Sequence, residues 1–385
     1  MKKILVINTK YRIFGGEDSN IIDEIKLLKK YFHIEYLEYN NSDNLSLYDV
    51  ISLLNNSNNA SNKRLIEVIK RFKPDVAYVH NTWFKSNLGI FDILKSEGIQ
   101  TFVKIHNYRF DCSRYRFSSE HLKGSLQCPA CGLDREKVGK FNKYYSDSFI
   151  KSYFLSRYSR KYLDILKNYP LKVLVLSRFQ KKYLINLGID KDKISIYLNP
   201  IEIKEENYKD YEPGSNYVVY AGRVIKDKGV EELLQSWHKV EPKNLTLKII
   251  GSGDISNKLE KKYKYNSIQF LGLLDNNEAK EIIKGSRAVI TATKLYEGQP
   301  RVLLEASSYG VPSIYPSFGG MDEFFPEDYE LSFKQFNYDD LNNKLLALTD
   351  QNFLIQESKK VIDFVSANLN EEILINQLNS FINEG

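Results

Sequence analysis

Two glutamates, Glu297 and Glu305, flank a short polar turn within residues 296–306, YEGQPRVLLEA. Pro300 suits the first position of a helix and Gly310 the residue after its last turn, so the segment predicts a strand, a tight turn and a helix. Such a turn exposes backbone N–H groups at the positive end of the helix, where an anion can bind. At about 1.5 Å per residue, Glu305 lies roughly 7.5 Å along the axis from Pro300. This spacing suits a nucleotide sugar, whose ribose and hexose hydroxyls flank a diphosphate.

Two cations form a second candidate group within residues 218–234, VVYAGRVIKDKGVEELL. A predicted strand runs into Gly222 and Arg223, and Lys228 precedes Gly229 at the start of an amphipathic helix. Both cations are therefore expected at the carboxyl end of a strand, where open parallel sheets bind ligands. The guanidinium offers a planar fork of donors and the ammonium a point charge, and both stabilise a departing diphosphate. Taken singly, these cations and glutamates would be solvated surface residues.

Together the two segments resemble the family 4 glycosyltransferases, which have the GT-B fold. Glu297 to Glu305 is similar to their E-x7-E motif, and the GR…KG pattern about 75 residues earlier is similar to their diphosphate clamp. The resemblance covers most of the chain and is best over about residues 174–325. Smaller matches are VLSRFQ with Ser177, YLNP with Asn199 and Pro200, IIGSGD with Gly251 and Gly253, and FLG ending at Gly272.

The resemblance implies roles for individual residues. Arg223, Lys228 and Glu297 are expected to be catalytic, together with His106. No protein nucleophile is nominated, and Glu305 is expected to hold the ribose. The donor-binding residues that we expect are Gly15, Gly16, Gly222, Gly251, Gly272, Gly298, Gln299, Pro300, Arg301 and Glu305.

The first half contributes fewer candidates. Gly15 and Gly16 follow the first predicted strand and let backbone N–H groups approach an anionic or sugar ligand, although a plain helix-entry turn is the alternative. In KIHNYRFDC, His106 ends a predicted strand and resembles the family's histidine near the donor sugar, against the alternative of a structural histidine. His80, also at a strand end, and Arg109 are expected to contact the acceptor.

Three cysteines, Cys112, Cys128 and Cys131, form C-x15-C-x2-C. The last pair has zinc-site spacing, and His121 is a candidate fourth ligand. The two interpretations are a structural metal loop and free thiols in a packed loop, of which free thiols are favoured, so no metal is included among the expected site ligands.

A D-x-D sequence occurs at Asp190 and Asp192, after Gly188. It lies in a predicted helix-to-strand turn, far in sequence from the phosphate-binding segments. We interpret it as a solvated turn, so the transfer is expected to need neither a catalytic metal nor a cofactor.

The elements that position these residues alternate between short apolar strands and longer helical patterns, which is typical of α/β folds with parallel sheets. We expect the GT-B architecture, with two Rossmann-like domains facing each other across a cleft. Predicted strands are residues 3–8, 33–38, 75–80, 101–106, 171–176 and 193–198 in the first half, and 217–221, 245–250, 267–271, 288–293 and 312–315 in the second.

The 385 residues are enough for two domains. Residues 199–215 show neither the hydrophobic period of a helix nor that of a strand, and they contain Pro200, Pro213 and Gly214. The linker between the domains is therefore placed there. We expect an acceptor-binding domain over 1–200, onto which a C-terminal helix at about 365–385 packs, and a donor-binding domain over 201–364.

The composition is that of an ordinary globular protein, with 42% hydrophobic and 27% charged residues. The apolar run at residues 4–7 is too short for a signal peptide, and no run of about 18 apolar residues occurs. A cytoplasmic location is expected, which the few cysteines also favour.

The net charge of +6 is concentrated in residues 135–161, where eight basic residues face two acidic ones among seven aromatics. This mixture suits an anionic membrane surface on the inner face of the cell membrane. A helix with a core stripe and a solvated basic face explains it equally well. No nucleic-acid partner is expected.

The predicted function is transfer of a hexosyl or N-acetylhexosaminyl group from a nucleoside diphosphate sugar, with a UDP-sugar favoured, to a saccharide acceptor with retention of configuration. The frequent Lys, Asn and Ile suggest a bacterial enzyme of capsule, O-antigen or exopolysaccharide assembly, with a lipid-linked acceptor. The alternatives are a sugar-nucleotide epimerase or phosphorylase of the same fold and a non-catalytic sugar-binding protein. A nicotinamide oxidoreductase is disfavoured because no full dinucleotide fingerprint follows the first strand.

Overall fold

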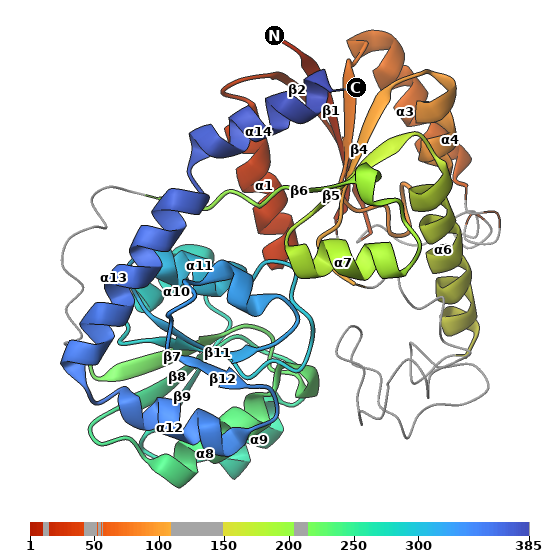
Figure 1. Cartoon of the computed structure of the whole chain (residues 1–385). Coiled ribbons are helices and arrows are strands. Elements are labelled where there is room, and N and C mark those ends of the chain that lie inside the picture. Colours follow the sequence, from red (N-terminus) through yellow and green to blue (C-terminus); the bar gives the residue numbers. More distant parts are fainter. Residues whose placement is uncertain are drawn as a thin grey trace. The chain divides into compact units, whose positions relative to one another are not determined.

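The computed structural model describes residues 1–10, 15–41, 52, 55, 57–108, 149–203 and 215–384. The chain divides into two compact units, Met1–Pro200 with Glu371–Gly385, and Ile201–Asn370. Each unit is built on its own six-stranded sheet, with every pairing parallel (Figure 1). These are the two Rossmann-like sheets of the GT-B fold that the sequence predicts. Within the described ranges, no helix is both long and apolar enough to cross a membrane.

The N-terminal sheet has the strand order β2-β1-β3-β4-β5-β6. Its strands are β1 (Lys3–Lys10), β2 (His33–Asn40), β3 (Val76–Val79), β4 (Gln100–Lys104), β5 (Leu171–Val175) and β6 (Ile194–Ile196). The helices of this unit are α1 (Gly16–Leu28), α3 (Asn59–Phe72), α4 (Gly89–Ser96), α6 (Phe149–Asn168), α7 (Arg178–Asn186) and α14 (Glu371–Asn383), with a 3-10 turn η3 (Lys191–Lys193).

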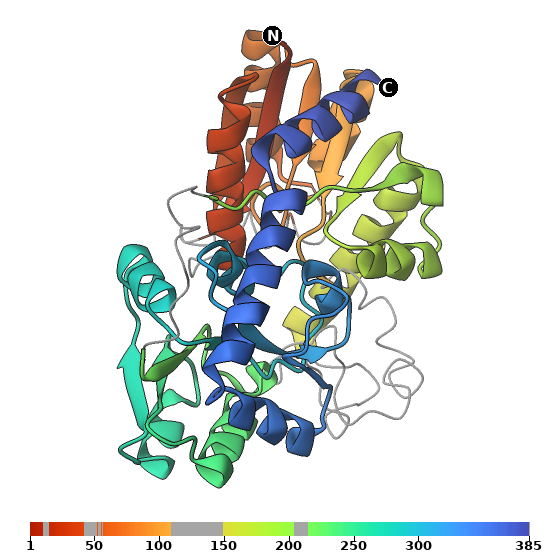
Figure 2. The same cartoon turned by 60° about the vertical axis from the view of Figure 1, so that its left-hand side comes forward.

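Helices cover both faces of this sheet, which is why its central strands are apolar throughout. Along β1, Leu5 and Ile7 pack into a core shared with α3, α4 and α6, whereas Ile4 and Val6 pack into a core shared with α1 and α14. This alternation follows from the period of two along a strand. Figure 2 shows α1 and α14 on the same side of the sheet.

The C-terminal helix is tied to the N-terminal unit at both of its ends. Glu371 lies 2.7 Å from Lys30, and Glu384, just beyond the helix, lies 2.7 Å from Lys172. Between them, Gln377 Nε2 donates to the carbonyl of Ile196 at 2.9 Å. The last residues of the chain therefore complete the core of its first unit.

The C-terminal sheet has the order β12-β11-β10-β7-β8-β9. Its strands are β7 (Tyr217–Ala221), β8 (Thr246–Ile250), β9 (Ile268–Gly272), β10 (Val289–Ile290), β11 (Ser313–Ser317) and β12 (Ser332–Lys334). Its helices are α8 (Val230–Val240), α9 (Ser256–Lys262), α10 (Asn276–Lys284), α11 (Arg301–Ser308), α12 (Tyr338–Ala347) and α13 (Gln351–Asn368), with 3-10 turns η5 (Lys226–Lys228) and η6 (Met321–Phe324).

The eleven predicted strands are all present, with ends that differ by a few residues. The sequence analysis did not predict β12, because its three residues, SFK, are too few to show the alternating hydrophobic pattern of a strand. Pro300 is not the first helical residue of α11 but its N-cap, because its ψ of 79° lies outside the helical range. Gly310 follows the helix with a φ of 74°, as predicted.

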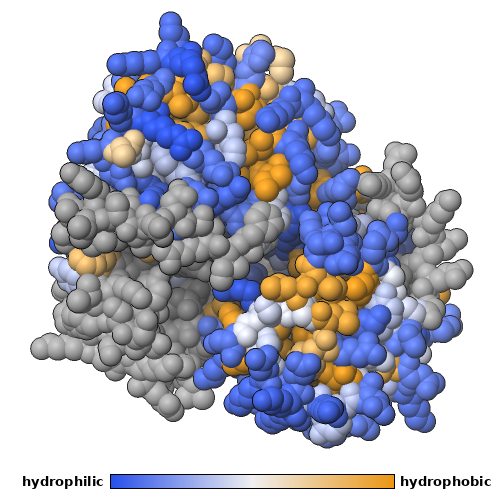
Figure 3. Space-filling view, turned by 180° about the vertical axis from the view of Figure 1, so that it is seen from behind, coloured by the Kyte–Doolittle hydropathy of each residue, from blue (hydrophilic) through white to orange (hydrophobic). Residues whose placement is uncertain are grey.

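Hydrophobic side chains also reach the surface of both units, next to hydrophilic ones (Figure 3). The most exposed large apolar side chain among the described residues is Leu273, at 77%. It directly follows β9, at the carboxyl edge of the C-terminal sheet.

Candidate active site

Glycines allow the loops at the carboxyl edge of the C-terminal sheet to pack backbone against backbone. Gly251 follows β8 with a φ of 122°, and a Cβ there would lie 2.0 Å from the carbonyl oxygen of Gly222, which follows β7. Gly229 precedes α8 with a φ of 65°, and a Cβ there would lie 1.8 Å from the carbonyl of Ala292. Only glycine fits both positions. The loops after β7, β8 and β10 are thus brought together.

This packing places Lys228 against Glu297. The ammonium, at the end of η5, lies 2.5 Å from Oε1 of the carboxylate, which is on the loop between β10 and α11. Thr293 Oγ1 donates to the same oxygen at 3.0 Å. Two of the four expected catalytic side chains therefore form one ion pair, and each remains about a fifth exposed, at 21% and 23%.

Arg223 belongs to the same group through Tyr220. The Tyr220 hydroxyl donates to the carbonyl of Arg223 at 2.8 Å. Burial raises the pKa of Tyr220 far above its usual value, the charge of Glu297 raises it further and the charge of Arg223 opposes the shift. Tyr220 thus fixes the backbone of Arg223 at the end of β7. Sequence analysis missed Tyr220 and Thr293, because a tyrosine in an apolar strand and a threonine in a loop carry no distinguishing signal.

Helix α11 begins next to this group. Glu305 lies one turn inside it and is only 8% exposed. Its Oε1 accepts from Arg301, from Nη2 at 2.8 Å and from Nε at 2.9 Å. Two predicted donor-binding residues thus contact each other, while Gly298, Gln299 and Pro300 form the turn before the helix.

The edge strand β9 contributes Gly272 to this side of the sheet. Gly272 has a φ of 69°, and its carbonyl accepts from the backbone N–H of Gly251 at 2.7 Å. The C-terminal unit therefore carries seven of the predicted catalytic and donor-binding positions on the loops at the carboxyl ends of β7, β8, β9 and β10, namely Gly222, Arg223, Lys228, Gly251, Gly272, Glu297 and Gly298.

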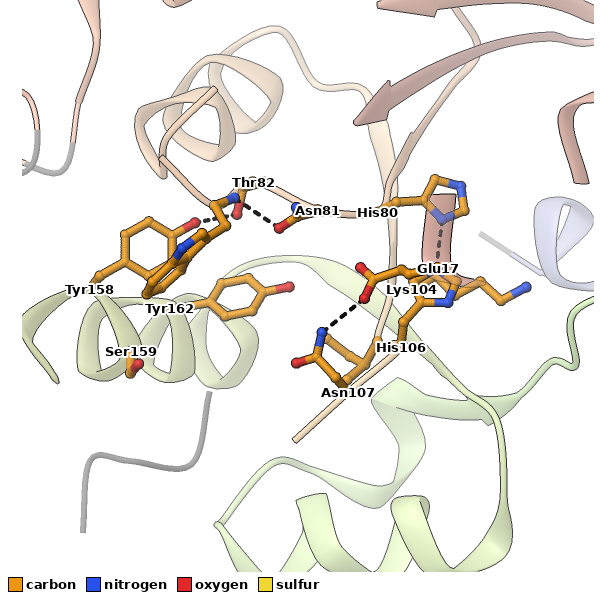
Figure 4. A pocket seen from close by; sticks show the side chains of 12 residues that line it. Glu17, His80, Asn81, Thr82, Lys104, His106, Asn107, Tyr158, Ser159 and Tyr162 are labelled. Carbon is orange, nitrogen blue, oxygen red and sulfur yellow. Dashed lines mark hydrogen bonds between the residues drawn. The ribbon is translucent and has the colours of Figure 1, made fainter. Parts of the chain in front are cut away.

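A separate cavity of about 50 Å³ lies at the carboxyl ends of β3 and β4 in the N-terminal unit. Figure 4 shows Tyr158 and Tyr162 of α6 on one side of it and His80 and His106 on the other. The strands end earlier than predicted, at Val79 and Lys104, so both histidines stand on loops. Glu17 and Trp83 also line the cavity.

The two histidines contact each other. His80 Nδ1 and His106 Nε2 lie 2.9 Å apart, and the rings are stacked with an interplanar angle of 21°. Burial lowers the pKa of both imidazoles well below the ordinary range, and the charge of Lys104 lowers each further. Both rings are therefore neutral near pH 7. His80 is 3% exposed, and both histidines line the cavity.

A fully buried ion pair lies beside them. Lys104 Nζ is 2.8 and 3.0 Å from the two oxygens of Glu24 and donates to the carbonyl of Leu198 at 3.2 Å. The hydroxyl of Tyr78 donates to Glu24 at 2.7 Å. A buried pair is tolerated when further hydrogen bonds satisfy the remaining donors and lone pairs, as they do here.

The other sequence candidates have varied outcomes. Gly15 is the N-cap of α1, and its N–H donates to the Asp18 carboxylate at 3.1 Å, while Gly16 is the first helical residue. Asp190 caps the exposed turn η3 by accepting from the N–H of Asp192 at 3.0 Å. The candidates that lie outside the described residues are Arg109, Cys112, His121, Cys128 and Cys131.

The basic, aromatic segment 135–161 is described only from residue 149 onwards. There it forms the first part of α6, in which Tyr158 is buried in the core and Arg157 and Arg160 are exposed. The described side chains of this part thus include one buried aromatic and two exposed arginines. Among the described residues, no group of three or more His, Cys, Asp or Glu side chains is arranged to hold a metal ion.

Part of the chain is similar to a described family of proteins. Residues 203–363 match the family described as Glycosyl transferases group 1. AmsD of Erwinia amylovora, an amylovoran biosynthesis glycosyltransferase, is 30% identical over 149 residues, which cover 37% of this chain and 42% of AmsD. The UDP-Gal:alpha-D-GlcNAc-diphosphoundecaprenol alpha-1,3-galactosyltransferase of Escherichia coli is 26% identical over 213 residues, covering 53% of this chain and 50% of the relative.

The chain spans about half the length of the curated relatives it matches. Among solved structures, Anabaena HepE in complex with UDP and glucose aligns over 100% of both chains, with a TM-score of 0.67 and 12% identity. At this identity the likeness concerns the fold, which is GT-B.

Proposed function

Because residues 203–363 match the family of group 1 glycosyl transferases, we propose that the protein transfers a hexosyl or N-acetylhexosaminyl group from a nucleoside diphosphate sugar to a saccharide acceptor. The observation that carries this proposal is the Lys228–Glu297 ion pair at the carboxyl edge of the C-terminal sheet, the edge at which Arg223 follows β7. The cations suit a diphosphate, and the carboxylate suits the hydroxyls of the transferred sugar.

UDP is the nucleotide that we favour. The Escherichia coli relative is named for UDP-Gal, and HepE was solved with UDP and glucose. In this chain, the exposed Leu273 directly after Gly272 offers an apolar surface that a base would cover. Covering such a side chain contributes about 25 cal/mol per Å² of apolar area removed from water.

In the proposed reaction, the bond between the anomeric carbon and the diphosphate oxygen breaks, and a bond to the acceptor oxygen forms with retention of configuration. The acceptor's hydroxyl proton passes to the departing diphosphate. Arg223, Lys228 and the N-terminus of α11 stabilise the negative charge that develops on the leaving group. No protein side chain forms a covalent intermediate, and neither a metal nor a cofactor takes part.

The N-terminal unit is proposed to bind the acceptor at the cavity beside His106. Aromatic side chains such as Trp83 and Tyr158 suit the apolar faces of sugar rings, and Glu17 accepts hydrogen bonds. A lipid-linked saccharide is the favoured acceptor, in line with the name of the Escherichia coli relative.

The proposal is tested by screening nucleotide sugars for thermal stabilisation, since a ligand that binds only the native state raises its stability. UDP-glucose, UDP-galactose and UDP-N-acetylglucosamine are compared with UDP alone, and the rate of UDP release is measured for each. Arg223→Ala should abolish the stabilisation. Lys239→Ala is the matched control, because this exposed lysine lies at the opposite end of α8. If no nucleotide sugar stabilises or turns over on the wild-type protein, the proposal is wrong.

A further inference from the structure

The carboxylate of Glu297 is held by only one of its two oxygens. Lys228 Nζ and Thr293 Oγ1 both contact Oε1, at 2.5 and 3.0 Å. Within the part of the chain that the structure describes, no side chain or backbone group hydrogen-bonds to Oε2. Because an ionised carboxylate has about four lone-pair sites, Oε2 remains free to accept from a ligand.

Thr293 can act only as a donor towards this carboxylate. The backbone N–H of Leu295 donates to Thr293 Oγ1 at 3.3 Å, so the single hydroxyl hydrogen is directed to Glu297. Thr293 itself is fully buried and does not reach a ligand. Its effect on a substrate must therefore pass through Glu297.

The backbone is held by contacts both before and after Thr293. Before it, the carbonyl of Ala292 packs against Gly229, where no side chain would fit. After it, the N–H of Lys294 donates to the carbonyl of Asp227 at 3.0 Å, and the Lys294 ammonium pairs with Glu232 at 2.5 Å. These contacts fix the loop to the start of α8. The ion pair with Glu232 also neutralises Lys294. Arg223 and Lys228 are therefore the cations that we assign to the diphosphate.

We propose that Thr293 is a positioning residue for the transfer: together with Lys228 it holds Glu297 by Oε1, and so presents Oε2 to a hydroxyl of the transferred sugar. The Lys228 ammonium has three N–H donors, and one of them binds Glu297. The other two can donate to phosphate oxygens. One cation then links the leaving group to the carboxylate that orients the sugar. The inference rests on the proposed function, because it assigns a role within the same donor site.

The test is Thr293→Val, which keeps the shape of the side chain and removes its donor. The rate of UDP release at saturating UDP-sugar should fall about tenfold to a hundredfold, as for loss of one contact that orients the reacting group. KM for the donor should stay within about threefold, and calorimetric binding of UDP alone should not change, since UDP lacks the sugar that Oε2 contacts.

Two further variants distinguish a loss of Glu297 orientation from a general structural effect of the substitution. Thr293→Ser restores the donor and should recover the rate to within about threefold of wild type. Thr349→Val removes an exposed hydroxyl in the same unit, which donates to the carbonyl of Leu346 at 2.9 Å, and should leave the rate unchanged.

The inference is overturned if Thr293→Val turns over at the wild-type rate, or if Thr293→Ser is as slow as Thr293→Val. It is equally overturned if UDP and UDP-sugar binding weaken together with the melting temperature, because the role is then structural. A wild-type protein that neither binds nor turns over any of the three UDP-sugars refutes the proposed function and this inference with it. Wild-type turnover with an unaffected Thr293→Val refutes the inference alone.

Discussion

The neutral pair of His80 and His106 should make the N-terminal unit sensitive to acid. In the unfolded chain each imidazole titrates at a pKa of about 6.5, whereas in the native unit burial and the charge of Lys104 hold both pKa values well below that. The unfolded state therefore binds more protons in this range, and the free energy of unfolding falls as the pH drops below about 6.5. Above that pH the contribution of the pair to stability is complete.

The magnitude follows from linkage. If a histidine stays neutral in the native unit at pH 5.5, protonation of the unfolded chain lowers the free energy of unfolding by about 1.4 kcal/mol, and by about 2.8 kcal/mol for two. Among the described residues, the other ionisable side chains that line the cavity or contact Lys104 are Lys104 itself, Glu24, Glu17, Tyr78, Tyr158 and Tyr162. They are unchanged when His80 and His106 are both replaced by asparagine, so the difference between the two proteins isolates the imidazoles.

The assay is urea unfolding at pH 7.5 and pH 5.5, followed by tryptophan fluorescence. The chain has two tryptophans, and Trp83 lies at the cavity of the N-terminal unit while Trp237 lies in the other unit. A Trp237→Phe background therefore reports on the N-terminal unit alone. The double variant should lose about 2.8 kcal/mol less than the parent between the two pH values. Equal losses in both proteins would refute the assignment of a neutral native pair.

Four further outcomes are expected. Glu297→Gln and Arg223→Ala should each lower turnover at least about tenfold to a hundredfold in a folded protein, checked by UDP release and circular dichroism. Lys104→Met leaves Glu24 buried without its cation and should cost about 3–5 kcal/mol in urea unfolding, most of which a second change, Glu24→Gln, should recover. EDTA should leave the transfer rate largely intact, and restoration of a lost rate by magnesium or manganese would contradict metal independence. If residues 135–161 bind an anionic membrane, the protein should sediment with anionic vesicles at low salt and should be released from them at about 0.5 M salt. Protein that stays in the supernatant at low salt would refute the membrane role.

The alternation of strands and helices, and hence the two parallel sheets, could be predicted because the hydrophobic period is a local property of the chain. The start of α11 was also predictable, since Pro300 and Gly310 mark its two ends by their own backbone preferences. Boundaries were less accurate. The strands β3 and β4 stop short of His80 and His106, because pairing with neighbouring strands, rather than residue type, decides where a strand ends.

The sequence by itself determined which residues stand at strand ends and helix starts, and so which could carry chemistry. Only the tertiary structure decided how they pair. Lys228 and Glu297 are 69 residues apart, and Lys104 and Glu24 are 80 apart, yet each pair is in direct contact. Nothing in linear spacing encodes such partners, because a parallel sheet brings the carboxyl ends of its strands to one edge whatever the length of the connections. The same edge gives Thr293 its role, since its hydroxyl has a function only once Glu297 and Lys228 lie beside it.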